Sequence, residues 1–261
     1  MSNFDWGITE RKLVIFLPNY NMSKMAEFSI TKIKTVVPQK DWIIIIGNDN
    51  ENYDFSHLES QNVRFFTLNR KDKNPRNSLF IRNYLIKRCR SELLFQKDAE
   101  VCLKGDFIAS CMNGHWRAGY IKVLNQAQTK LFLDSKDPKC NIIKIDPTIP
   151  TDLQKFKQLL LRKNGSRSYN TFWHYACCMH TKHLQDMHGY DEDFKLYGWG
   201  DPDMFCRLIA SKYYLIPDYN CCAIHPDHNR GKTHEDAIKM KEIFKLKDPT
   251  IIIRNNEWGA G

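Results

Sequence analysis

The chain has 261 residues, of which 42% are hydrophobic and 26% are charged. This length and composition can bury a sizeable core, which argues against a disordered chain and leaves room for one α/β domain or two small ones. Lys and Arg outnumber Asp and Glu by 39 to 30, a net charge of +9. Because the basic residues are scattered, this charge is compatible with phosphate-bearing substrates, anionic lipid or nucleic acid without requiring any of them.

Two features bear on where the protein works. The nine cysteines form no C-x-x-C pair, which is typical of reduced thiols in a cytosolic protein. Residues 1–12 lack the apolar core of a signal peptide, and the longest apolar run, residues 42–47, is too short to cross a bilayer. We therefore expect a soluble, cytoplasmic protein, and a peripheral contact with a membrane surface through basic residues stays open.

The first half of the chain alternates strands and helices. Apolar and β-branched runs predict four buried strands, over residues 13–17, 42–46, 62–68 and 92–96. Helical spacing predicts helices over residues 23–37, which Pro38 would end, and over residues 78–90. Residues 47–50, Gly-Asn-Asp-Asn, are typical of a turn after the second strand. This alternation predicts a parallel sheet with helical crossovers.

The second half is less regular. Further elements are expected as one or two strands within residues 114–132, a strand within 171–180, and helices over 203–211 and 233–246. Residues 130–167 are basic, polar and broken by prolines, so we interpret them as an insertion or mobile loop with a helix over 151–162. There is no internal repeat, and we expect a single α/β domain over residues 1–261.

Polar residues follow three of the predicted strands, namely Asn19, Asp49 and Asp98. Ligands of open parallel sheets bind outside the carboxyl ends of the strands, so we expect these side chains to lie side by side along one edge. Asp98 and Glu100 are separated by one residue, and alternate residues of an extended chain point the same way. The pair suits a hard cation such as Mg²⁺ or Mn²⁺, and a solvated turn is the alternative interpretation.

Two later clusters carry further candidate residues. Glycines flank Trp199, whose flat face suits a sugar ring, and Asp201 and Asp203 precede an amphipathic helix, where helix capping is the alternative role for either. Farther on, His225-Pro226-Asp227-His228 places two histidines three residues apart on a predicted loop. Such a pair can share a metal, although a surface loop with histidines is the commoner explanation.

The segment 189–208 resembles the C-terminal motif of GT-A nucleotide-sugar glycosyltransferases of the galactosyltransferase and chondroitin-polymerase type. Gly189-Tyr190-Asp191-Glu192-Asp193-Phe194 matches that family's G-(F/Y)-D-E-x-F phrase. Tyr197-Gly198-Trp199-Gly200-Asp201-Pro202-Asp203 matches its W-G-G-E-D-x-D phrase with departures, since the family's glutamate falls on Gly200. By this resemblance Asp201 would be the catalytic base, and Trp199, Gly200 and Asp203 would contact the acceptor.

The first half resembles family-2 glycosyltransferases more loosely. Pro18-Asn19-Tyr20-Asn21 is similar to their P-x-Y-N loop against the uridine, Asp49 to the residue that contacts the base, and Arg82-Asn83 to an R-N pair before the metal motif. Asp98-Ala99-Glu100 resembles their D-x-D motif, and His225 resembles the late histidine that completes the metal shell, with His228 as the reserve. The resemblance implies donor contacts from Pro18, Asn19, Tyr20, Asp49, Arg82 and Asp98, and metal contacts from Asp98, Glu100 and His225.

Taken together, the resemblance covers residues 12–230 and implies a GT-A, Rossmann-like fold with a mostly parallel central sheet flanked by helices. Residues 12–105 would form the nucleotide-binding half and residues 106–261 the acceptor-binding half. The implied activity is an inverting transfer of a hexosyl unit from a UDP-sugar to a hydroxyl of a glycan, glycolipid or protein, as in polysaccharide biosynthesis, with Mn²⁺ or Mg²⁺ as cofactor.

Two other functions stay open at this stage. The net charge of +9 would suit a nucleic-acid-binding protein, but zinc-finger spacing and a basic stripe with interleaved aromatic residues are absent, so we expect no nucleic-acid partner. Because Gly200 replaces the family's glutamate, the chain would also suit a transferase-like domain that binds sugar without turnover.

Overall fold

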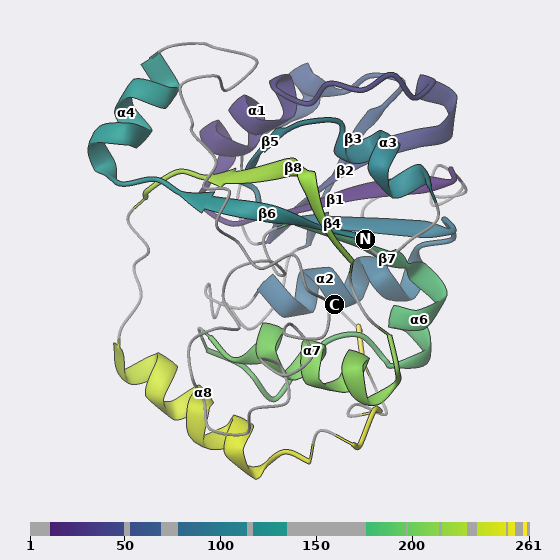
Figure 1. Cartoon of the computed structure of the whole chain (residues 1–261), viewed down its shortest axis with the longest axis vertical. Helices are drawn as coiled ribbons and strands as arrows, with labels where there is room; N and C mark the ends of the chain where they lie inside the picture. The colour runs from purple at the N-terminus through teal and green to yellow at the C-terminus, as the bar shows by residue number, and fades with distance from the viewer. Residues whose placement is uncertain are drawn as a thin grey trace.

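The computed structural model describes residues 11–49, 53–68, 78–113, 117–134, 176–196, 198–213, 216–228, 234–248, 250–253 and 258–259. One eight-stranded sheet runs through this part of the chain, in the order β3-β2-β1-β4-β7-β6-β8-β5. Helices lie on both faces of the sheet (Figure 1). Four of the seven neighbouring strand pairs are parallel, so the predicted mostly parallel sheet flanked by helices is confirmed.

The first four strands form the parallel part of the sheet. They are β1 (Leu13–Asn19), β2 (Trp42–Asp49), β3 (Val63–Leu68) and β4 (Leu93–Lys97). Strand β1 lies in the middle, with Leu13 opposite both Trp42 of β2 and Leu93 of β4. The helices α1 (Ser23–Thr31) and α2 (Ser78–Arg88) belong to the crossovers between these strands. The predicted strand–helix alternation of the first half is therefore confirmed.

The two faces of these strands belong to different hydrophobic cores. Val14 and Phe16 pack in one core with Leu85 of α2, whereas Leu13 and Ile15 pack in the other with Ala26 of α1. Successive side chains of a strand point to opposite faces, and a strand that is apolar throughout can fill a core on each side. All residues of β1 and β2 are buried, as predicted for the apolar run that begins at Trp42.

The chain after β4 extends the same sheet with strands of both directions. Its strands are β5 (Cys102–Lys104), β6 (Arg117–Val123), β7 (Ala176–His180) and β8 (Ile216–His225). Its helices are α3 (Phe107–Met112), α4 (Gln126–Asp134), α6 (Thr181–Asp186), α7 (Gly200–Ala210) and α8 (His234–Leu246). Strand β7 runs antiparallel to β4, and β5, which belongs to residues 12–105, pairs with β8 at the far edge. Strands β7, β6 and β8 of the second half therefore lie between β4 and β5 of the first half, and the two halves interleave in one sheet.

Two predicted boundaries are wrong. The first helix ends at Thr31 and does not continue to residue 37, because Ile33, Val36 and Val37 belong to a β-branched stretch that disfavours a helix, and Val36 is 87% exposed. The turn predicted over residues 47–50 is also wrong in its first part. Strand β2 continues to Asp49, because residues 47–49 pair with β1 on one side or β3 on the other.

Some expectations fall outside the described residues. These are the helix over residues 151–162 and most of the insertion at 130–167, of which residues 130–134 lie in α4. No helix in the described part of the chain combines the length and apolar character that crossing a membrane requires.

The loop after α6 is fixed by a glycine and an asparagine. Gly189 has a φ of +63°, and a Cβ at this position would lie 2.2 Å from Asn83 Oδ1. Asn83 uses that oxygen to accept from the backbone N–H of Tyr190 at 2.7 Å, and its Nδ2 donates to the carbonyl of Tyr190 at 2.9 Å. Glycine is therefore required here for both its backbone conformation and the close approach of α2.

Replacing Gly189 by Ala is expected to lower the free energy of unfolding by about 2–4 kcal/mol, because a left-handed backbone and a clash act together. Gly198→Ala is the matched control. Its φ is +93°, but a Cβ there meets no atom of the described residues nearer than 3.9 Å, so only the backbone cost of about 1 kcal/mol is expected. Urea unfolding of both variants gives the difference, and equal losses would show that Asn83 yields to the added methyl group.

Candidate active site

The carboxyl ends of β1 and β2 carry a buried pair of amides. Asn19 Nδ2 donates to Asn48 Oδ1 at 2.9 Å and to Ser23 Oγ at 3.1 Å. Asp49, the last residue of β2, is 2% exposed, and Asp98 follows β4 on the other side of β1. The structure therefore places the three predicted edge residues along one edge of the sheet, and it adds Asn48, which sequence reasoning had assigned to a turn.

Two further predicted donor contacts flank this edge. Pro18 lies within β1 opposite Gly47, and Tyr20 is partly exposed just beyond the strand. Asn48 Nδ2 donates to the carbonyl of Tyr53 at 3.0 Å, which ties the end of β2 to the segment that follows it. The surroundings of the predicted uridine loop are thus held by hydrogen bonds between buried amides and backbone.

A buried guanidinium connects helix α2 to the end of β4. Arg82 donates through Nη2 to Asp98 Oδ1 and through Nη1 to Gln96 Oε1 at 3.2 Å. The Arg82 side chain is 3% exposed and that of Asp98 is 25% exposed. Tyr190 completes this arrangement, since its hydroxyl donates to the same Gln96 oxygen at 3.2 Å and the guanidinium carbon lies 5.9 Å from its ring centroid.

The charges around Asp98 do not cancel. Burial raises the pKa of Asp98 to about 6, and the carboxylates of Glu100 and Asp201 add to this rise while Arg82 and His225 oppose it. Burial opposes the charge of Arg82, yet its electrostatic interactions with the neighbouring Tyr190, Asp98 and Asp201 raise the pKa of Arg82 above its usual value. The carboxylates of Asp98, Glu100 and Asp201 thus lie near one another, an arrangement that suits a bound cation.

Three side chains at the same edge could hold that cation. Glu100, His225 and His228 present ligand atoms that all lie within 4.8 Å of one another. Glu100 Oε1 is 3.3 Å from His225 Nε2 and 3.1 Å from His228 Nε2. Burial opposes the charge of Glu100, but the two imidazoles outweigh it and hold the pKa of Glu100 well below its usual value. His225 ends strand β8 and is 2% exposed, so the prediction that it lies on a surface loop is wrong.

A buried lysine fixes the turn between Asp98 and Glu100. Lys97, the last residue of β4, is fully buried, and its Nζ donates to Ser29 Oγ at 2.9 Å and to the carbonyls of Asp98 at 3.1 Å and Ala99 at 3.5 Å. Burial lowers the pKa of Lys97 to about 8. Sequence reasoning missed this residue, because a lysine at the end of a strand is ordinarily solvated and no pattern marks it as buried.

The start of α7 brings the later motif to the same place. Asp201 lies in the first turn of α7, close enough for its charge to act on both Asp98 and Arg82. Trp199 precedes the helix with a φ of +64°, a costly conformation for a bulky residue that is common at functional sites. The Trp199 ring packs against Phe244 of α8, with centroids 5.1 Å apart.

Two other residues of this motif have structural contacts. Gly200 is buried, and a Cβ there would lie 2.5 Å from Leu79 Cδ1, so the glycine lets the first turns of α7 and α2 touch. This packing is a physical reason for glycine where the family has glutamate. Asp203 is 1% exposed and pairs with Arg207 at 2.8 Å inside the protein. The predicted contacts of Gly200 and Asp203 with the acceptor stay predictions. The packing of Gly200 on Leu79 and the ion pair of Asp203 with Arg207 do not support them.

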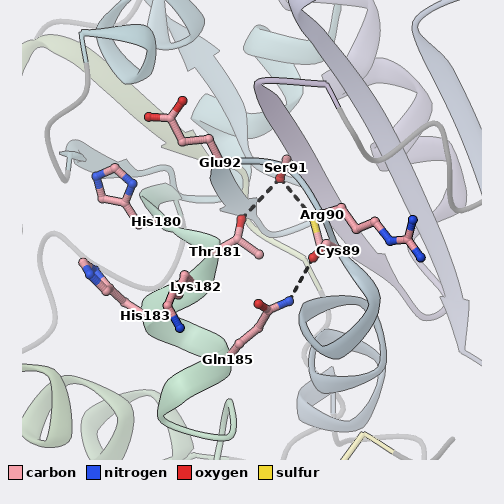
Figure 2. Close-up of a pocket in the computed structure, with 9 residues that line it drawn as sticks. All are labelled: Cys89, Arg90, Ser91, Glu92, His180, Thr181, Lys182, His183 and Gln185. Atoms are coloured by element: carbon pink, nitrogen blue, oxygen red, sulfur yellow. Dashed lines mark hydrogen bonds between the residues drawn. The ribbon is translucent and has the colours of Figure 1, made fainter.

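A separate hollow lies at the opposite end of β4. It has a volume of about 400 Å³ and is lined by Cys89, Arg90, Ser91, Glu92, His180, Thr181, Lys182, His183 and Gln185. Figure 2 shows two pairs of these residues directed at each other, whereas Arg90 points away: Ser91 Oγ lies 3.2 Å from Thr181 Oγ1, and Gln185 Nε2 donates to the carbonyl of Cys89 at 2.8 Å. Residues 89–92 precede β4 whereas Asp98 follows it, so this hollow is not part of the candidate active site.

No protein-family model and no curated protein matches the sequence. Among solved structures, S. aureus TarS 1-349 in complex with UDP-GlcNAc matches with a TM-score of 0.54 and 13% identity, over 89% of this chain and 65% of that one. TarS 1-349 also matches in another crystal structure, with a TM-score of 0.50 and 14% identity, over 83% of this chain and 58% of that one.

A mannosyltransferase of Pyrobaculum calidifontis, PcManGT in complex with GDP-Man and Mn²⁺, matches with 13% identity over 86% of this chain and 59% of that one. Its TM-score of 0.48 is too low to establish a common fold. The chain spans less than two thirds of either TarS 1-349 chain. The likeness to TarS establishes the GT-A fold that the motifs implied.

The buried pair of Asp203 and Arg207 generates a prediction about stability. Arg207 also donates to the carbonyls of Met187, Gly189 and Ile252. Replacing Arg207 by Met should cost about 3–5 kcal/mol in the free energy of unfolding, because Asp203 would be left charged and buried.

Lys182→Met is the matched control for Arg207→Met. It breaks another pair four residues apart, with Asp186 at 2.8 Å, but there the side chains are 79% and 54% exposed. Its expected cost is below about 0.5 kcal/mol. Similar losses in the two variants, measured by urea unfolding, would contradict a structural role for Asp203.

Proposed function

We propose that the protein transfers a sugar from a UDP-sugar to an acceptor hydroxyl with inversion at the anomeric carbon, in a metal-dependent reaction. The observation that carries this proposal is the convergence of Asp98, Asp201 and the group Glu100, His225 and His228 at one edge of a GT-A fold. These residues come from distant parts of the chain. A fold likeness alone would not favour turnover, whereas a candidate base beside a candidate cation site does.

On the donor side, the residues at the ends of β1 and β2 would receive the nucleotide. Asn19 and Asp49 are buried at that edge, and Pro18 and Tyr20 flank Asn19. The complex of TarS with UDP-GlcNAc supports a UDP-sugar as the donor. Arg82 would act mainly by orienting Asp98, because its guanidinium is buried and already bonded to that carboxylate.

The cation site fits a divalent metal in its chemistry. Glu100 offers a carboxylate oxygen and His225 an imidazole nitrogen, which are common ligands of Mn²⁺ and of other divalent ions. When bound, such an ion supplies positive charge to the diphosphate that leaves. Lys97 would keep the backbone between Asp98 and Glu100 in the conformation that presents both carboxylates to the same edge.

Asp201 is the proposed general base. Its carboxylate would accept the proton of the acceptor hydroxyl while that oxygen attacks the anomeric carbon and the bond from this carbon to the diphosphate oxygen breaks. The electron pair of the broken bond leaves with the diphosphate. Trp199, which α8 holds by the contact with Phe244, would lie against the acceptor sugar.

A thermal-shift screen of nucleotide sugars with and without Mn²⁺ tests the proposed donor. A ligand that binds the native state raises the melting temperature, so a UDP-sugar should raise it more in the presence of Mn²⁺. Salt-sensitive binding of RNA or DNA without any response to UDP would favour the nucleic-acid-binding alternative instead.

Replacing Asp201 by Asn should lower kcat for transfer by about 10²–10⁴-fold, because the base is lost, and should leave the Kd of UDP nearly unchanged. Asp193→Asn is the matched control, since Asp193 is 66% exposed and belongs to the neighbouring phrase of the motif. It is expected to retain full activity. Full activity of Asp201→Asn would remove Asp201 from the mechanism, and donor binding with no turnover in the unaltered protein would favour a sugar-binding domain.

A further inference from the structure

Both imidazoles of the C-terminal histidine pair reach the same carboxylate oxygen. His225 Nε2 and His228 Nε2 lie 3.3 Å and 3.1 Å from Glu100 Oε1, and the two rings stack with centroids 5.3 Å apart. In the part of the chain that the structure describes, this is the one group of three or more such ligand residues close enough to share an ion. The two histidines are therefore placed as partners and not as alternatives.

Strand pairing and hydrogen bonds hold Glu100, His225 and His228 in place. Strand β5 pairs with β8 so that Cys102 lies opposite Ile224, which puts Glu100 next to the end of β8. The carbonyl of His225 accepts from the N–H of Leu124 at 2.9 Å. The N–H of Asp227 donates to Thr129 Oγ1 at 2.7 Å, and this bond holds the loop that carries His228 against α4.

Asp98 is held differently. Its Oδ1 accepts from Arg82 Nη2, and Asp98 is not a member of the group of mutually close ligands. Losing that bond would leave a guanidinium that is 3% exposed short of its carboxylate partner, so Oδ1 stays with Arg82 and only Oδ2, which lies outside the group of mutually close ligand atoms, could turn towards an ion. Among the described residues, Glu100 is not paired with a guanidinium, and its carboxylate bonds to the two imidazoles and to its own backbone N–H.

Two imidazoles and one carboxylate form a ligand set with a distinct metal preference. Magnesium and calcium favour oxygen ligands, whereas imidazole nitrogen favours first-row transition metals. Three protein ligands also leave coordination positions open for phosphate oxygens.

We propose that Glu100, His225 and His228 together are the protein ligands of one divalent ion, that Asp98 stays paired with Arg82 outside this ligand set, and that the site selects a transition metal such as Mn²⁺ or Co²⁺ over Mg²⁺. The inference rests on the proposed function only because the ion that it names is the one that the proposed reaction would use. The proposed ligand set differs from the expected one, in which Asp98 was a ligand and His228 a substitute for His225.

Cobalt titration of the chelator-treated protein tests the ligand set without any sugar substrate. The visible absorption of bound Co²⁺ reports its nitrogen ligands, and calorimetry gives the Kd. We expect Co²⁺ to bind at least about tenfold more tightly than Mg²⁺. His228→Gln should weaken Co²⁺ binding by at least about tenfold and change the spectrum. His228 is suited to this substitution because its side chain is 17% exposed.

Asp98→Asn is the matched control, and it should keep both the Kd for Co²⁺ and the spectrum close to those of the unaltered protein. Thermal unfolding of each variant without metal separates a lost ligand from a lost fold. Loss of Co²⁺ binding in Asp98→Asn but not in His228→Gln would overturn the inference, and so would equal affinity for Mg²⁺ and Co²⁺. If the variants behave as expected but no nucleotide sugar binds, the metal site stands and the proposed transferase function fails.

Discussion

The candidate site depends on one buried positive charge. Arg82 is buried, and moving such a charge away from its partners would leave it unpaired in the interior. Its bonds to Asp98 and Gln96 therefore fix the position of α2 relative to β4. The neighbouring Asn83 binds the backbone of Tyr190, so the same helix also fixes the loop that leads towards α7. Arg82 and Asn83, two consecutive residues of α2, thus connect the first half of the chain to the second half at the candidate site.

The G-Y-D-E-D-F phrase, residues 189–194, serves mainly to hold α2 and the loop that leads towards α7 in place. Glu192 accepts from Asn83 Nδ2 at 2.8 Å and from the N–H of Gly259 at 2.9 Å, and Asp191 pairs with Lys247 at 2.9 Å. The carboxylates of Asp191 and Glu192 in this phrase are thus already bonded to other groups within the protein. In the second phrase Gly200 and Asp203 also have structural contacts, which leaves Asp201 as the carboxylate that acts on the Asp98 region.

Much of the parallel half of the fold could be predicted from the sequence, because strands that are apolar throughout and helices between them allow few arrangements. The positions of Asn19 and Asp98 could also be predicted, because the carboxyl ends of parallel neighbouring strands lie at the same edge of the sheet. What could not be predicted depends on partners distant in sequence. Residues 47–49 have turn chemistry, but their pairing with β1 or β3 outweighs it. Lys97 became recognisable only when Ser29 and the turn carbonyls were placed around it.

The interleaving of the sheet has a consequence for folding. Glu100 and His228 are 128 residues apart, and they meet only when β8 lies between β6 and β5. Contacts of such sequence separation form late, because the entropy of closing the intervening chain must be lost first. The edge formed by β5 and β8 is thus expected to be among the last parts to assemble. A cation bound there would stabilise that edge by an amount that grows with the logarithm of its concentration relative to its Kd, so metal supply and the yield of completed fold would be linked in the cell.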